Sequence, residues 1–253
     1  MNTTVEVLLT PAELTGPALT DLASTACVVF DVLRATSTMV TALHQGANEI
    51  IVVSSIEEAL ALRSTSPDVL LAGERNGERI RASETNSIDF DLGNSPREFT
   101  PEAIAGKTIA ITTTNGTLAI RACERAPVVY AGSLLNLTAT ANALLREGTK
   151  RLLLVCAGTG QGASYEDVLG AGALLQLLPE TRFSRTSDAC AMAAALHERI
   201  GKDLKHAFGQ TVNGRRLTAK PDLCADVAFC AQKDVFRHAV RVTGQRARLQ
   251  TTT

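Results

Sequence analysis

Two carboxylates in this sequence each follow a short apolar run, and each is accompanied by an arginine. Asp31 follows one such run and precedes Arg34, while Glu74 follows another and is itself followed by Arg75. Carboxylate oxygens, together with water and phosphate oxygens, are the ligands that Mg²⁺ prefers, and arginine binds anions through paired N–H groups. Either carboxylate alone is more typical of a helix cap or a surface ion pair. The repeated pattern, however, predicts a site in which Asp31 and Glu74 hold Mg²⁺ and both arginines bind substrate anions.

A polar turn later in the chain has the residue types of an anion site. Thr113, Thr114, Asn115 and Gly116 follow the apolar residues 108–111 and precede a predicted helix. Glycine lets the backbone approach a ligand, hydroxyls donate hydrogen bonds, and the free N–H groups of a helix N-terminus attract anions. The turn therefore predicts a phosphate site, although Thr and Asn also suit a simple N-cap. Both interpretations stay open.

Two further patterns indicate other chemistry. Residues 158–163 imitate the GxGxxA fingerprint of dinucleotide-binding folds, which would favour an NAD(P)-dependent oxidoreductase. The fingerprint also needs a second strand that ends in an acidic residue, whereas residues 174–178 are helical in character. Cys156 ends a predicted strand and could act as a nucleophile, but a buried structural thiol is its more typical role. The histidines are isolated along the chain, so histidine-centred catalysis has little support.

The candidate residues need secondary structure that brings them to one place. Apolar strands alternate with predicted helices of about 10 to 15 residues, which is typical of parallel βαβ units with helices on both faces of a sheet. We therefore predict a three-layer α/β/α fold with a mostly parallel sheet, whose carboxyl strand ends form the active site. The predicted strands are residues 5–9, 27–30, 49–53, 69–72, 108–111, 128–131, 151–156 and 235–242.

The domain organisation is expected to be simple, with residues 1–253 forming a single α/β domain. A long polar segment at 78–101 interrupts the pattern, and loops of that length are usually functional or disordered. The alternative is two subdomains that meet near residues 78–107. The basic end, residues 237–248, is predicted to be a solvated tail rather than a binding arm.

Composition excludes several classes of function. The 253 residues carry a formal net charge of −1, with 4% aromatic residues and no tryptophan, so neither nucleic acid nor an anionic membrane is an expected partner. No apolar run approaches the roughly 20 residues of a membrane span. The six cysteines contain no CxxC pair, so we expect them to be reduced. These features predict a cytoplasmic protein.

Several segments together resemble the 2-phosphosulfolactate phosphatase family. The matching segments are residues 31–37, 73–75, 91–96, 113–117, 156–158 with 166–167, and 213–226. The resemblance implies a Mg²⁺-dependent phosphatase with a three-layer α/β fold that acts on phosphorylated sulfolactate in coenzyme M biosynthesis. The segment 91–96 adds Asn94 and Ser95 to the expected substrate-binding residues. One departure is at residues 220–222, where a glycine-containing turn is expected instead of Lys-Pro-Asp.

The expected function is hydrolysis of a phosphate monoester, with 2-phosphosulfolactate converted to sulfolactate and phosphate. Asp31, Arg34 and Glu74 are the predicted catalytic residues, and Asp31 could either bind the metal or attack phosphorus directly. The expected partner is a small phosphorylated acid, and a homodimer is left open. The alternatives are an NAD(P)-dependent oxidoreductase and a non-catalytic binder of phosphorylated acids.

Overall fold

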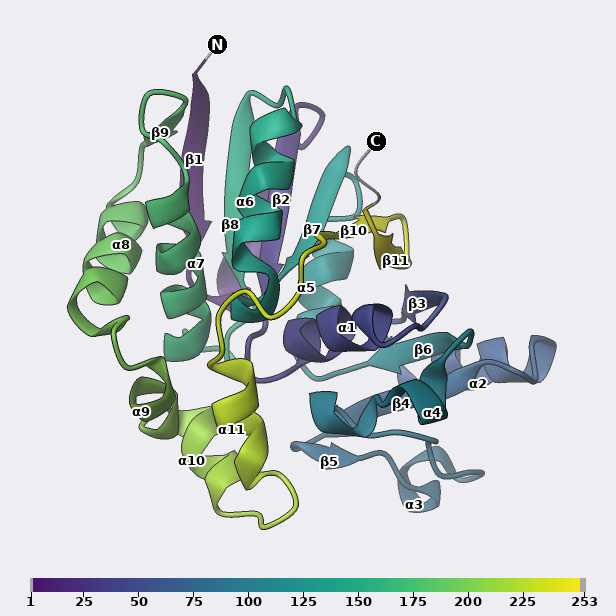
Figure 1. Ribbon diagram of the computed structural model, residues 1–253. Coiled ribbons are helices and arrows are strands. Elements are labelled where there is room, and N and C mark those ends of the chain that lie inside the picture. The colour runs from purple at the N-terminus through teal and green to yellow at the C-terminus, as the bar shows by residue number, and fades with distance from the viewer. Residues whose placement is uncertain (1, 251–253) are drawn as a thin grey trace.

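A computed structural model describes residues 2–250 and shows a three-layer α/β fold in which helices cover both faces of one sheet (Figure 1). Within residues 2–250 this sheet has 11 strands in the order β5-β4-β6-β3-β11-β10-β7-β2-β8-β1-β9. The predicted fold class is therefore confirmed. The strands are β1 (Thr3–Leu8), β2 (Thr25–Phe30), β3 (Glu49–Val52), β4 (Leu70–Arg75), β5 (Glu78–Arg79), β6 (Thr108–Thr112), β7 (Val128–Gly132), β8 (Arg151–Cys156), β9 (Phe183–Arg185), β10 (Val240–Thr243) and β11 (Arg246–Leu249).

The sheet consists of two parallel groups joined by an antiparallel hairpin. Strands β7, β2, β8, β1 and β9 run parallel to one another, as do β3, β6 and β4. The hairpin β10–β11 pairs antiparallel with β7 on one side and with β3 on the other. Figure 1 shows the strands of the two groups at a steep angle to each other. The sheet is thus mixed and strongly twisted.

The hairpin corrects the prediction of a solvated tail at residues 237–248. Val240 is buried in the sheet, while Arg246 and Arg248 both hydrogen-bond Glu49 of β3. Apolar and basic residues therefore alternate as they do in a strand with one buried face. The charge run obscures this pattern in the sequence because the carboxylate partner lies 197 positions before Arg246.

Some of the helices begin at a residue whose side chain caps them. Ser55, for example, accepts a hydrogen bond from the N–H of Glu58 and so caps α2 (Ile56–Thr65). Figure 1 shows α9, α10 and α11 gathered at one end of the molecule, opposite the chain termini. The helices are α1 (Ala35–His44), α2 (Ile56–Thr65), α3 (Ala82–Thr85), α4 (Pro101–Ile104), α5 (Gly116–Ala122), α6 (Leu137–Arg146), α7 (Tyr165–Leu177), α8 (Asp188–Ile200), α9 (Leu204–Gly209), α10 (Val212–Thr218) and α11 (Cys224–Cys230), with 3₁₀ turns at Pro11–Thr15, Pro17–Leu19, Pro96–Glu98 and Leu134–Asn136.

The central strands are buried on both faces, as parallel strands usually are. In β2, Val28 and Phe30 pack with residues of α6 and α7, whereas Cys27 and Val29 pack with residues of α1 and α5. Burying one side chain of this size contributes about 1.5–3 kcal/mol. The core therefore fixes the carboxyl end of β2, where Asp31 follows.

The polar segment at 78–101 contains short ordered elements rather than one long loop. β5 forms a small hairpin with β4, and the backbone N–H of Phe90 donates to Ile80 at 3.0 Å. Ile80 and Phe90 are buried in a cluster that includes Leu71 of β4. The segment therefore supports the carboxyl end of β4, which contains Glu74.

Two expectations from composition concern the state of the cysteines and the presence of a membrane-spanning helix. All six cysteines are free, and five of them are buried, as expected for reduced thiols. Along the described chain, residues 2–250, we find no helix with the length and apolar character that crossing a membrane requires.

Candidate active site

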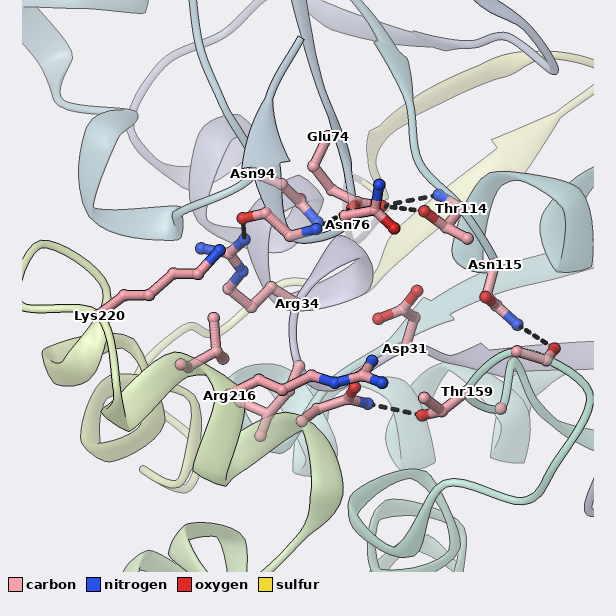
Figure 2. Close-up of a pocket in the computed structure, with 16 residues that line it drawn as sticks. Asp31, Arg34, Glu74, Asn76, Asn94, Thr114, Asn115, Thr159, Arg216 and Lys220 are labelled. Carbon is pink, nitrogen blue, oxygen red and sulfur yellow. Dashed lines mark hydrogen bonds between the residues drawn. The ribbon is translucent and has the colours of Figure 1, made fainter.

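A cavity of about 310 Å³ lies where strand ends from both parallel groups converge. Its wall includes Asp31 after β2, Glu74 in β4, Thr114 after β6 and Gly158 after β8. The sequence predicts one shared edge of a parallel sheet, but the hairpin gives the two groups opposite directions. The twist of the sheet brings their ends together instead. Figure 2 shows Asp31 near the centre of this cavity.

Asp31 is held by the first turn of α1. Its Oδ1 accepts a hydrogen bond of 3.1 Å from the N–H of Ala35, and its own N–H donates to Thr36 Oγ1 at 3.0 Å. Burial of the carboxyl, with a smaller contribution from the negative charges of Glu74 and Glu166, raises the pKa of Asp31 to about 7, against the lowering effect of the Ala35 N–H. Glu74 and Glu166 thus each lie close enough to Asp31 to repel its charge, which favours a cation beside Asp31.

Gly116 allows α5 to begin directly against Asp31. A Cβ atom at this position would overlap Asp31 Oδ2 and the Ala35 side chain. Any other residue would push α5 away from the carboxylate. The glycine that the sequence assigns to phosphate contact therefore has a clear packing role beside Asp31.

Glu74 lies within β4. The sequence instead predicts that it lies in the turn after this strand. Its Oε1 accepts hydrogen bonds from Thr114, at 2.7 Å from N and 2.8 Å from Oγ1, and its Oε2 accepts one of 2.7 Å from the N–H of Gly77. A carboxylate offers about four acceptor positions. Three are in use here, so Glu74 anchors the turns after β4 and β6 and keeps one position for a ligand.

Arg34 lines the cavity but already has a carboxylate partner. Its Nη1 donates to Asp226 Oδ2 at 2.9 Å and its Nη2 to the carbonyl of Gly77 at 2.8 Å. Ser95 does not line the cavity; its hydroxyl donates to Asp226 Oδ1 at 2.7 Å. Asp226 therefore holds the Arg34 guanidinium in place, and Ser95 in turn holds Asp226.

Three other predicted substrate-binding residues lie outside the cavity wall, namely Arg75, Thr113 and the Gly116 that packs beside Asp31. Arg75 donates to its neighbour's carbonyl at 2.6 Å and to Thr112 Oγ1 at 3.1 Å. Thr113 is buried and exchanges hydrogen bonds with Thr117 across the start of α5. The helix-cap interpretation of the threonine turn thus describes Thr113.

Asn94 and Asn115 do line the cavity. The side-chain amide of Asn115 donates to the carbonyls of Ala157 at 3.0 Å and Gly160 at 3.1 Å, which ties the turn after β6 to the turn after β8. The buried Asn94 Oδ1 has no hydrogen-bond partner within residues 2–250. A buried acceptor without a partner is costly, so Asn94 has an acceptor available for a ligand.

α10 and the residues after it supply cavity residues that sequence reasoning missed. Lys220 lines the wall and donates to Glu78 Oε1 at 2.7 Å. Arg216 also lines the wall and, across the described part of the chain, makes neither an ion pair nor a hydrogen bond. Figure 2 shows its guanidinium extending toward Asp31 from the opposite wall. The only signal in the sequence was the resemblance of residues 213–226, which assigned no role to either residue.

The first turn of α7 is hydrogen-bonded to the segments that follow β2 and β8 and to α10. Asp167 Oδ1 accepts from the N–H of Val32 at 2.8 Å and its Oδ2 from Gly158 at 3.1 Å, which joins the ends of β2 and β8. Burial raises the pKa of Asp167 well above its usual range, and Asp31 adds to this effect. Glu166 accepts a hydrogen bond of 2.7 Å from the Asn213 side chain of α10.

The surroundings of Cys156 and of the glycine-rich turn at residues 158–162 favour structural roles for both. Burial raises the pKa of the Cys156 thiol well above its usual range, so the reactive thiolate is disfavoured. Gly158 and Gly160 have positive φ angles of 76° and 60° and line the same cavity as Asp31. The strand that follows α7 is the short edge strand β9, which ends in Arg185 and not in an acidic residue. The dinucleotide fingerprint therefore lacks its second half.

Comparisons with known proteins identify a family and relatives that are similar to this chain. A family model described as 2-phosphosulpholactate phosphatase matches residues 9–245. A protein of Deinococcus radiodurans named "Probable 2-phosphosulfolactate phosphatase" is 40% identical over 211 residues, which cover 83% of this chain and 84% of the relative. A protein with the same name from Caldanaerobacter subterraneus subsp. tengcongensis is 38% identical over 218 residues, which cover 85% of this chain and 87% of the relative. Another from Thermotoga petrophila is 40% identical over 210 residues, which cover 83% of this chain and 86% of the relative.

Proposed function

The chain belongs to the 2-phosphosulfolactate phosphatase family, and we propose that it hydrolyses 2-phosphosulfolactate to sulfolactate and phosphate with the help of Mg²⁺. It is a phosphoric monoester hydrolase. The observation that carries the proposal is the position of Asp31, which faces Arg216 across a cavity that also contains Arg34 and Lys220. Within residues 2–250 the Arg216 side chain has no ion-pair or hydrogen-bond partner. Carboxylates and cations are thus arranged around one small polar space.

The cations suit a substrate with several negative groups. The proposed substrate carries a phosphate, a carboxylate and a sulfonate on a three-carbon chain. No residue in 2–250 accepts a hydrogen bond from the Arg216 side chain, whereas Asp226 already compensates the charge of Arg34. Arg216 therefore binds a substrate anion directly. Lys220 is a second cation in the same wall, and its only ion-pair partner within residues 2–250 is the exposed Glu78.

A divalent cation fits the carboxylates of this cavity. Within residues 2–250 no three His, Cys, Asp or Glu side chains are close enough to form a complete metal cage. Mg²⁺ does not need one, because it keeps several waters and is held by one or two carboxylates plus substrate phosphate. Asp31 would hold it, and the remaining acceptor position of Glu74 would bind it or one of its waters. Without a cation, Asp31 and Glu74 would repel a phosphate in this space.

Hydrolysis adds water to phosphorus and breaks the bond to the substrate's C2 oxygen, which then takes a proton. When bound, Mg²⁺ supplies positive charge that neutralises the phosphate oxygens. Arg216 holds and orients the substrate, and Asn94 accepts a hydrogen bond from a hydroxyl or from bound water. Glu74 and Asn115 fix the turns that enclose the phosphate. Positioning and charge neutralisation are the main requirements of phosphoryl transfer.

The decisive experiment measures phosphate release from a panel of small phosphorylated acids. We expect fastest release from 2-phosphosulfolactate, slower release from 2-phospholactate, which lacks the sulfonate, and little release from either without Mg²⁺. Equal rates with both substrates would contradict recognition of the sulfonate. Binding of 2-phosphosulfolactate without any phosphate release would instead support a non-catalytic binder.

A further inference from the structure

A second, larger cavity lies apart from the active site. Its volume is about 550 Å³, and it shares no lining residue with the cavity that contains Asp31. The first turn of α7, the end of α8 and the helices α9 and α10 form its walls. Figure 1 shows α9 and α10 together beyond the ends of α7 and α8.

The lining combines an apolar surface with a cationic rim. Ile200, Ala207 and Val212 supply apolar surface together with the ring of Tyr165. Tyr165 and Val212 are 42% and 50% exposed, which is unusual for apolar side chains of this size that face a common hollow. The cavity therefore offers an apolar surface that nothing in the described chain covers.

The charges around this surface are mostly positive. Arg199, Lys202 and Arg215 line the cavity together with His206, whereas Asp203 is the single carboxylate of the lining. The Asp203 carboxylate accepts a hydrogen bond of 3.0 Å from the backbone N–H of His206 and so caps α9. The rim thus favours an anion over a neutral or cationic ligand.

We infer that this cavity is a second ligand site, specific for an amphiphilic monoanion: a carboxylate on an aliphatic or aromatic body. Small-molecule sites typically measure about 300–1,000 Å³ and combine apolar walls with a few charged groups, as this cavity does. A second copy of the chain is a poor occupant. A symmetric interface would place the cationic rims of the two copies against each other.

The position of α10 couples this site to the active site. Val212 and Arg215 face the second cavity, while Asn213 and Arg216 of the same short helix line the cavity that contains Asp31. Tyr165 immediately precedes Glu166, which accepts the hydrogen bond from Asn213. A ligand that displaces Val212 therefore shifts the residues on both sides of α10. This coupling rests on the proposed function, because it assumes that Arg216 binds an anion.

Isothermal titration of the full chain with sodium decanoate tests the site, with decyltrimethylammonium as the probe of opposite charge. We expect saturable binding of one decanoate, at a Kd of roughly 1 mM or below, which corresponds to about −4 kcal/mol or better. The double variant Arg199→Glu, Lys202→Glu should weaken binding at least tenfold. Lys205→Glu, on α9 but outside the lining, is the matched control and should bind decanoate normally. Val212→Trp, which fills the cavity, should also weaken binding.

Four outcomes would overturn the site. They are no saturable binding to the wild type, equal binding of the cationic probe, unchanged binding in the charge-reversed or filled variants, and a change of oligomeric state in the double variant, which would indicate an interface between copies. Coupling is measured separately, as the change that saturating decanoate causes in the affinity for inorganic phosphate. We expect a change of about fivefold or more, a typical size for linked sites. Unchanged phosphate affinity would overturn the coupling, and absent phosphate binding would instead count against the proposed function.

Discussion

The guanidinium of Arg34 donates a hydrogen bond of 2.9 Å to the carboxylate of Asp226, which lies 192 positions later in the chain. Their side chains are only 3% and 0% exposed, so water solvates neither charge well. Ser95 donates to the second carboxylate oxygen at 2.7 Å. This pair joins the loop after β2 to α11 and so fixes the C-terminal helices against the cavity.

Asp226→Asn should strongly destabilise the protein. The substitution keeps the shape of the side chain but leaves the buried charge of Arg34 uncompensated, which typically costs about 3–5 kcal/mol. Chemical denaturation measures the change in the free energy of unfolding. Asp222→Asn, an exposed neighbour before α11, is the matched control and should be nearly neutral. Equal unfolding midpoints for the two variants would contradict the role given to the pair.

Arg216→Gln should impair turnover without loss of stability, because Arg216 makes no ion pair or hydrogen bond in residues 2–250 that the substitution could break. Losing a charge-assisted hydrogen bond to the substrate costs about 1.5–3 kcal/mol, so kcat/KM for 2-phosphosulfolactate should fall roughly tenfold to a hundredfold. Steady-state kinetics measure this change. Lys205→Gln removes an exposed cation of α9 that lies outside both cavity walls, and it should leave kcat/KM near its wild-type value. Similar losses in both variants would argue against substrate binding by Arg216.

Glu49 should make the protein more sensitive to acid. Its burial tends to raise the pKa of the carboxyl, but hydrogen bonds from Arg246 and Arg248 outweigh burial and hold this pKa below its ordinary value. A lowered pKa contributes stability that is present above the ordinary value of about 4.3 and is lost as pH falls through the lowered pKa of the folded state. Thermal melts from neutral pH to about pH 3 should therefore show a smaller acid-induced loss in Glu49→Gln than in the wild type. Glu198→Gln, at an exposed site on α8, should behave as the wild type.

Cys156→Ser should keep near wild-type turnover. Burial disfavours the thiolate, and the residue lies outside the cavity wall. Rapid quenching with radiolabelled substrate, followed by peptide mapping, should recover no phosphate on Cys156. A label on Asp31 in the same map would identify Asp31 as the nucleophile and would contradict its proposed role in holding the metal.

The sequence predicts the elements better than the distant contacts. The strand before Asp31 is recognisable because its apolar run stops at a carboxylate. Polar and apolar residues do not alternate along it, which predicts that both of its faces are buried, as they are. Glu74 is harder to interpret, since the donors that use its oxygens include Thr114, which lies 40 positions later. Its place inside β4 follows from the hairpin with β5, whose signal in the sequence is the Asn76-Gly77 pair at the turn. Both residues have positive φ angles, as a two-residue hairpin turn of type I′ requires.

Residues at the C-terminal end could not be assigned roles from spacing alone. Arg216 and Asp226 look like ordinary helix charges, because nothing local shows that α10 lines the cavity or that α11 holds Arg34. The hairpin β10–β11 is hidden for a related reason, since its arginines find their carboxylate on β3. Chemistry-bearing residues next to apolar strands are thus predictable, whereas residues that reach the site through tertiary packing are not.

Phosphate release from 2-phosphosulfolactate, measured for the wild type and for Asp31→Asn while Mg²⁺ is removed with EDTA and restored, tests the central claim most directly. We expect the wild type to lose activity with EDTA and to regain it with Mg²⁺. Asp31→Asn should keep its melting temperature within a few degrees and lose turnover by at least about 10²-fold, the size expected for removing a key electrostatic group. Wild-type turnover by Asp31→Asn, or full activity of the wild type after thorough chelation, would contradict the account.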